Sequence, residues 1–149
     1  MSYPHVGFHF RVTFEDINGG SSQEAGFQEV TGLTVKMETE EIAEGGENRY
    51  KLKLPTRNSF GEITLKRAFY VDDAISTWAL AALEAMNDFD FEPKHLVIDL
   101  LDEEHQTLAQ WRVQSAWPTQ LQVSDLKSED NSIVVETITL TYQYFNRKK

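Results

Sequence analysis

VVETITLTYQYF, residues 134–145, decides the fold class because its side chains alternate between polar and apolar from Thr137 to Tyr144. Four apolar residues take one side of this stretch: Ile138, Leu140, Tyr142 and Tyr144. Four polar residues take the other: Thr137, Thr139, Thr141 and Gln143. Successive side chains of a β-strand point to opposite faces, so a period of two predicts a half-buried strand. We expect this long strand to run over about 132–145.

The same alternation recurs through most of the chain. It predicts further strands at about 5–14, 27–39, 50–54, 60–67, 95–102, 108–117 and 119–124. Gly32 offers a bend or bulge within the second of these strands, and Pro55 ends the third. Residues 16–24, rich in glycine, asparagine and serine, predict a turn or loop. A second loop, acidic and broken by glycines, is expected at 40–48.

One stretch has the period of a helix instead. Its apolar residues recur every three or four positions: Ile75, Trp78, Ala79, Ala82, Leu83 and Met86. Asp72 and Asp73 suit the N-terminal cap and dipole, so we expect one helix over about 72–87. Antiparallel strands with a single inserted helix predict a mainly β protein. The architecture expected is a β-sandwich or small barrel in one domain, residues 1–149.

Composition excludes several classes of function. The 149 residues carry 24 acidic and 14 basic side chains, and a net charge of −10 repels nucleic acid. The chain contains no cysteine, which excludes disulfides, thiolate metal sites and a cysteine nucleophile. The sequence contains neither a signal-like N-terminus nor an apolar run of the about 18 residues that span a bilayer, so no membrane insertion is expected.

No group of residues combines catalytic side chains with the spacing that catalysis needs. His5 and His9 lie about 13 Å apart along a strand and cannot share a metal ion. The cluster Asp99, Asp102, Glu103, Glu104 and His105 is interpreted as a solvated hairpin turn, with a calcium site as the alternative. We therefore expect no enzyme activity, no cofactor and no metal site.

Two residues break the pattern around them. Glu136 shares the apolar phase of Ile138 and Leu140, so either a bulge resets the register or its carboxylate faces a neighbouring group. Leu80 stands off the apolar stripe of the helix. Each is either a local irregularity or part of a subunit contact.

Several motifs, read in order, resemble the tail-tube protein family of contractile phages and phage-tail-like injection particles. They are FQEVTGL (27–33), EGGEN (44–48), KLPTRNSF (53–60), ITLKRAF (63–69), the helix with Trp78, AWP (116–118), VSDL (123–126) and VVETITLTYQYF (134–145). The tube protein of the type VI secretion system is structurally akin to this family. One departure is Ala68, where the family usually has glycine after L-K-R.

The resemblance implies a structural subunit that forms six-membered rings, whose inner sheets join into a barrel and stack into a tube. Implied partners are other copies of the chain, neighbouring tube rings, baseplate hub and spike proteins, and the contractile sheath. YPHVGFHF (3–10), LLDEEH (100–105) and YQYF (142–145) resemble the tube-initiating paralogue at the baseplate. The alternatives are the bulk tube subunit or, in another class, a free-standing β-sandwich that binds a ligand. Assembly is expected in the cytoplasm, into a particle that is extracellular or anchored to a membrane.

Two sets of contact residues follow from this interpretation. The acidic segment at 40–47 is followed by a basic segment at 49–53 (together, the arm), and opposite charges of this kind suit contacts between stacked subunits. The apolar side chain of Leu80 on the predicted helix suits such a contact as well. The candidates are Glu40, Glu41, Glu44, Gly45, Gly46, Glu47, Asn48, Arg49, Lys51, Lys53 and Leu80. The polar row of the last strand suits a wetted channel: Thr137, Thr139, Thr141 and Gln143.

Overall fold

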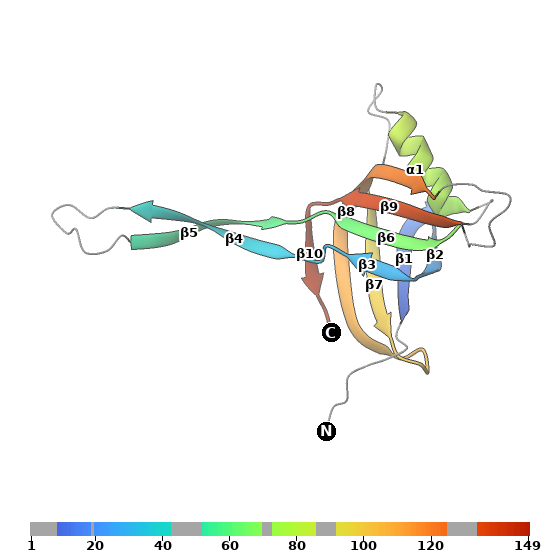
Figure 1. Cartoon of the computed structure of the whole chain (residues 1–149), viewed down its shortest axis with the longest axis horizontal. Coiled ribbons are helices and arrows are strands. Elements are labelled where there is room, and N and C mark those ends of the chain that lie inside the picture. Colours follow the sequence, from blue (N-terminus) through green and yellow to red (C-terminus); the bar gives the residue numbers. More distant parts are fainter. Residues whose placement is uncertain (1–8, 19, 43–51, 70–72, 86–91, 125–133) are drawn as a thin grey trace.

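A computed structural model describes residues 9–18, 20–42, 52–69, 73–85, 92–124 and 134–149 (Figure 1). In these ranges the chain forms one helix, α1 (Ala74–Glu84), and a series of β-strands. The strands are β1 (His9–Asn18), β2 (Ser21–Phe27), β3 (Glu29–Thr31), β4 (Val35–Ile42), β5 (Leu52–Phe60), β6 (Ile63–Ala68), β7 (Lys94–Leu101), β8 (Thr107–Val123), β9 (Val135–Thr141) and β10 (Tyr144–Arg147). The mainly β fold class with a single helix is confirmed.

Eight strands form one continuous antiparallel sheet in the order β2-β1-β7-β8-β9-β6-β3, with β10 also paired to β8. The long strand β8 belongs to both halves of this sheet. Its first part lies between β7 and β10, whereas its second part pairs with β9. At the junction Ser115 has a φ of 53°, and its N–H donates to Nδ1 of His95 at 3.2 Å. The register shift at this point marks a bulge, which bends the strand and lets the sheet fold over on itself.

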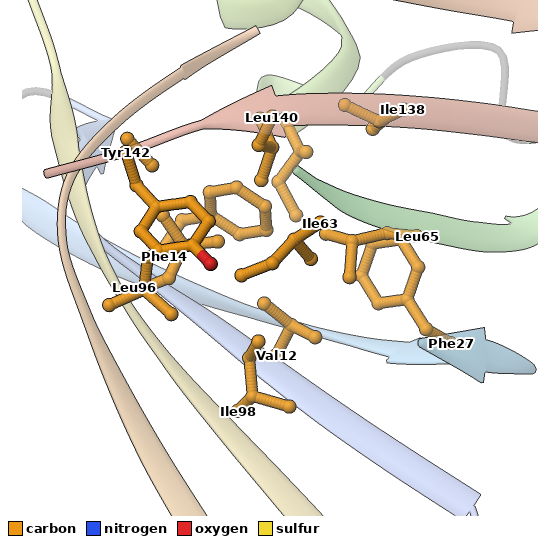
Figure 2. Close-up of a cluster of buried hydrophobic side chains, with 13 residues drawn as sticks. Val12, Phe14, Phe27, Ile63, Leu65, Leu96, Ile98, Ile138, Leu140 and Tyr142 are labelled. Atoms are coloured by element: carbon orange, nitrogen blue, oxygen red, sulfur yellow. The ribbon is translucent and has the colours of Figure 1, made fainter. Parts of the chain in front are cut away.

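Both halves of the sheet bury their inner faces in one core (Figure 2). The half around β1 and β7 contributes Val12, Phe14, Leu96 and Ile98. The half around β6 and β9 contributes Ile63, Leu65, Ile138 and Leu140. These residues are every second one along their strands, as the alternation of apolar and polar residues predicts for side chains that point into the core.

Helix α1 packs on this core through buried Ile75 and Ala79 and through Trp78, whose ring lies 5.8 Å from that of Phe14. Asp73 occupies the N-cap position, but its side chain makes no capping hydrogen bond. Instead its carboxylate accepts hydrogen bonds from Arg67 and Gln23. The helix is therefore tied to β6 and β2 by a side chain that the sequence interpretation assigned to capping.

Glu136 occupies an apolar position of its strand because its carboxylate belongs to the buried polar cluster around Arg67 and Asp73. It lies directly across from Arg67 in the β6–β9 pair, and the guanidinium is 3.7 Å from the Glu136 carboxylate. Ser76 donates to Glu136 at 2.7 Å and accepts from Arg67 at 3.0 Å. Of the two interpretations of Glu136, a carboxylate facing a neighbouring group is the one observed.

The hairpin of β4 and β5 forms a separate two-stranded sheet that projects far from the body (Figure 1). It leaves the body at Gly32, where φ is +90° and a Cβ atom would lie 1.8 Å from the carbonyl oxygen of Glu62. Only glycine fits this corner, since a side chain would overlap the backbone. The bend expected at Gly32 is confirmed.

Several predicted boundaries are wrong where burial does not follow the alternation. The loop expected at 16–24 is the tight β1–β2 hairpin, because β2 is an edge strand whose partly buried face carries polar Gln23 beside Ala25 and Phe27. The strand expected at 27–39 divides at Gly32 into β3 and β4. β5 continues through Pro55 to Phe60, because a bulge opposite Glu38 and Thr39 accommodates the proline.

Two further boundaries differ near the C-terminus. The strands expected at 108–117 and 119–124 are the single strand β8, in which Pro118 sits beside a register shift. The strand expected at 132–145 ends at Thr141, and the chain crosses to β10 on the other half of the sheet. The helix ends at Glu84, within its expected range of 72–87. Residues 5–8, 50–51, 72, 86–87 and 132–133 of the predicted elements lie outside the described residues.

Candidate subunit-contact surfaces

The outer face of β8, β9, β6 and β3 is polar along the rows that contain Thr137 and Thr139. Thr139 lies between Thr64 on β6 and Gln120 on β8, and Thr137 lies between Lys66 and Gln122. At the edge of the sheet, Nζ of Lys66 is 3.7 Å from the carboxylate of Glu29 on β3. Polar side chains on four neighbouring strands suit a surface that stays in contact with water.

The predicted polar row divides at the end of β9. Thr137, Thr139 and Thr141 lie on this outer face and are half-buried. Gln143 follows the end of β9, where its backbone N–H donates to the carbonyl of Gln114 at 3.0 Å. Its exposed side chain therefore belongs to the crossing between β9 and β10, because the strand does not continue.

The β4–β5 hairpin is exposed on both faces. Every side chain described from Val35 to Glu41 and from Lys53 to Ser59 is exposed. Among them are three large apolar ones: Val35, Met37 and Leu54. An isolated two-stranded hairpin is marginally stable in water, so a hairpin of this length needs a surface to pack against.

The hairpin pairs some of its own charges. Nε of Arg57 donates to the Glu38 carboxylate at 3.0 Å, and Glu41 lies directly across from Lys53. Glu40 lies across from Leu54. The other charged candidates of the arm lie outside the described residues, together with its glycines and asparagine: Glu44, Gly45, Gly46, Glu47, Asn48, Arg49 and Lys51.

A groove of about 780 Å³ lies at the base of the hairpin. Its floor is an aromatic cluster in which the ring of Phe60 is 5.1 Å from Phe145 and 6.0 Å from Tyr142. Burial raises the pKa of Tyr142 to about 12. Val35 and Tyr144 are exposed at the same place. Sequence reasoning missed this groove, because it forms where the hairpin meets β10, which is far from it along the chain.

Leu80 lies on α1 with 49% of its surface exposed. Its position off the apolar stripe of the helix is therefore as expected. Phe69, at the end of β6, is also exposed. Both side chains are available to a partner, although neither contributes to the groove.

Within the acidic cluster, residues 102–105 form the hairpin turn between β7 and β8, as interpreted from the sequence. The interpretation is wrong for Asp99, which lies in β7 and is buried. Asp99 accepts a hydrogen bond from Gln110 at 2.8 Å and pairs with Arg11 at 3.4 Å. Asp102 accepts backbone N–H bonds from Glu104 and Gln106. Among the described residues no group of three or more histidines and carboxylates is placed to hold a metal ion. None of the described helices is long and apolar enough to cross a membrane.

Solved structures share this arrangement over almost the whole chain. A chain of the anti-feeding prophage baseplate, solved with six-fold symmetry, has 26% identity and a TM-score of 0.78, covering 99% of this chain and 97% of that one. A chain of the tube-terminating cap of the same particle has 26% identity and a TM-score of 0.80, with coverage of 100% and 93%. A chain of the PVC sheath/tube terminator, at 24% identity and a TM-score of 0.80, covers 100% and 99%. No curated protein matches the sequence significantly.

The fold is thus that of the mainly β subunits found in these tube-bearing particles. Residues 6–146 match the family of the T4-like virus tail tube protein gp19, and the chain belongs to this family. Its class of function is that of a structural tail tube protein.

Proposed function

We propose that the protein forms a hexameric ring of the inner tube of a contractile injection particle, and that this ring initiates the tube at the baseplate. The observation that carries the proposal is the β4–β5 hairpin, which is exposed on both faces and projects from the body (Figure 1). The six-fold symmetry of the similar baseplate structure supports six copies per ring.

The hairpin supplies the contact between subunits in this proposal. Val35 and Met37 are exposed by 52% and 59% and lie two residues apart, on one face of β4. Burying them against another copy stabilises the hairpin by removing apolar surface from water. Glu40, Glu41, the arm residues at 44–49, Lys51, Lys53 and Leu80 are the further contact candidates.

The polar outer face of β9 lines the lumen in this proposal. Thr137, Thr139 and Thr141 face away from the core. Thr137 and Thr139 have polar neighbours on β6 and β8, whereas Thr141 lies across from Trp117 on β8. Gln143, in the crossing between β9 and β10, is a further lumen candidate beyond the end of this row. A lumen lined largely by threonine and glutamine stays hydrated and presents little apolar surface to passing cargo.

Deletion of Ala43–Gly46 tests the role of the hairpin. We expect the variant to fold as a monomer and to lose ring stacking, which sedimentation velocity and negative-stain microscopy measure. A second variant, Met37→Asp, keeps the hairpin length and removes one exposed apolar contact, with Lys36→Ser on the opposite face as its matched control. Normal tubes from both the deletion and Met37→Asp would reject the hairpin as the contact. A wild-type monomer that binds a small ligand in the groove would favour the free-standing module instead.

A single introduced cysteine tests the lumen, because the natural chain has none. In assembled tubes, Thr139→Cys should react with a small maleimide and be protected from a bulky polymer-linked maleimide. The same variant as a monomer should react with both reagents. Equal reaction of tubes with the bulky reagent would place Thr139 outside the lumen.

The initiating role rests on the resemblance of three segments to the initiator paralogue, and on the unlike surfaces of the hairpin and α1. A ring that joins two different neighbours needs two different faces. Quantitative mass spectrometry of purified particles tests it. About one ring of copies per particle supports the initiator, whereas a copy number that follows the sheath subunit makes this chain the bulk tube protein.

The remaining partners follow from the same placement. An initiating ring contacts the baseplate hub or spike on one side and the next tube ring on the other, with the sheath outside. The similar PVC protein comes from an extracellular contractile injection system, which supports an extracellular particle. We propose that this particle is assembled in the cytoplasm. Crosslinking mass spectrometry of the particle would identify these neighbours directly.

A further inference from the structure

We propose that His9 and His105 form a two-nitrogen binding site for a transition-metal dication such as Zn²⁺, Ni²⁺ or Cu²⁺. This site goes beyond the proposed function and does not depend on ring formation. The two histidines are 96 positions apart in the chain, yet Nε2 of His9 lies 3.0 Å from Nδ1 of His105. Their ring centroids are 4.8 Å apart, with the planes at 76° to each other.

The distance between the two nitrogens matches that of ligands sharing one ion. Imidazole nitrogens bind Zn²⁺ at about 2.0–2.1 Å, which separates two of them by about 3.3 Å at a tetrahedral angle and about 2.9 Å at a right angle. The observed 3.0 Å falls between these values. An ion can therefore replace the hydrogen bond between the rings with small rotations of the two side chains.

The turn between β7 and β8 positions His105. Its N–H donates to the carbonyl of Asp102 at 3.1 Å, and the N–H of Asp102 donates to the carbonyl of Gln106 at 3.0 Å. Asp102 also accepts two backbone N–H bonds inside the turn. His105 has a φ of 64°, in the left-handed region that histidine adopts more often than most residues. Hydrogen bonds throughout the turn fix this backbone, which limits the positions that the ring can take before an ion arrives.

His9 is positioned just as firmly, by pairing within the sheet. It lies directly across from Leu101, the last residue of β7 before the turn. Two rigid elements therefore present the two nitrogens, which lowers the entropic cost of binding an ion.

The ligand type selects the class of metal. Imidazole suits Zn²⁺, Ni²⁺ and Cu²⁺, whereas Ca²⁺ and Mg²⁺ prefer oxygen ligands. The exposed carboxylates of Glu103 and Glu104 in the same turn add negative charge that favours a cation. Water completes the coordination.

Calorimetric titration of the whole protein with ZnCl₂ tests the site. Wild type should bind one ion per chain. Because loss of a hydrogen-bonding partner behind a metal ligand already costs about 10–100-fold in affinity, loss of a ligand should weaken binding at least about tenfold. His9→Gln and His105→Asn are the test variants, and asparagine tolerates the left-handed backbone at residue 105.

His95→Gln is the matched control, because His95 lies in the same sheet but Nδ1 of its ring accepts the N–H of Ser115. It should bind Zn²⁺ as wild type does. Electron paramagnetic resonance of the protein with CuCl₂ should show two imidazole nitrogens, reduced to one in either test variant. Wild type that takes up no Zn²⁺, or His105→Asn that binds it as tightly as wild type, would overturn the proposal.

Discussion

Among the charged residues, Arg67 is the one whose substitution should lower the free energy of unfolding most. It is 2% exposed and lies between the carboxylates of Asp73 and Glu136. Arg67→Met leaves two carboxylates without their cation, and breaking a buried pair in this way costs about 3–5 kcal/mol. We expect a loss of this size in the free energy of unfolding, measured by urea denaturation.

Arg57→Met is the control for the loss of an arginine. Arg57 pairs with Glu38 on the exposed hairpin, where the two side chains are 80% and 48% exposed. Exposed pairs contribute about 0–1 kcal/mol, so this variant should unfold nearly as wild type does. Equal losses in the free energy of unfolding for the two variants would show that the buried cluster around Arg67 contributes no more to stability than an exposed ion pair.

Tyr142 should make stability depend on pH in the alkaline range. Burial raises its pKa in the folded protein to about 12, above the value of 10.0 for an unperturbed tyrosine. The unfolded chain therefore loses this proton first, so the stabilisation is complete below pH 10 and is lost as the pH rises towards 12. Urea unfolding of wild type and Tyr142→Phe across this range should show a steeper alkaline loss for wild type.

At pH 7, Tyr142→Phe should leave the free energy of unfolding nearly unchanged. Within the described part of the chain the buried Tyr142 hydroxyl has no hydrogen-bond partner, so phenylalanine removes a polar group that gains nothing from burial. Parallel pH profiles for the two proteins would contradict the raised pKa.

The corner between β3 and β4 determines whether the hairpin can leave the body. Gly32→Ala places a methyl group 1.8 Å from the carbonyl oxygen of Glu62, at a positive φ that alanine avoids. We expect the variant to fold poorly or to lose more than about 4 kcal/mol, measured by thermal melting. Gly26→Ala on β2 is the control: its Cβ has open space, so a change within about 1 kcal/mol is expected.

Strands could be predicted from the sequence where one face is buried and apolar and the other face is polar and exposed to solvent. β6 and β9 meet this condition, and the alternation of Ile63 and Leu65 with polar residues located them. The partly buried face of β2 includes polar Gln23, and the hairpin buries no face. The ends of these strands were therefore set by turns and bulges that alternation does not encode. Their boundaries were wrong for this reason.

Contacts between distant segments could not be predicted from the sequence. The groove joins the hairpin base to β10, and His9 meets His105 only because β1 pairs with β7. The contact candidates Glu40, Lys53 and Leu80 are exposed in the structure, but which of them meets a partner depends on a second copy of the chain.

At the scale of the whole molecule, net charge opposes assembly. Each chain carries −10, and the described charges of the hairpin partly pair with one another, which leaves apolar side chains for the contact. Repulsion between copies extends about 30 Å at 0.01 M salt and about 8 Å at physiological ionic strength. We therefore expect the critical concentration for assembly, measured by sedimentation, to fall as NaCl is added over this range. A rise would indicate that ion pairs between subunits dominate.

The shared strand β8 determines how the subunit bears mechanical load. It is hydrogen-bonded on both sides over Trp111–Val113, to β7 and to β10, and it continues into the other half of the sheet along β9. A pull along its axis shears many hydrogen bonds at the same time, whereas a pull on the tip of the hairpin opens its pairs one after another. Forced unfolding is governed by the rate of crossing the unfolding barrier, so the body resists a sudden thrust along β8 far longer than the free hairpin resists peeling.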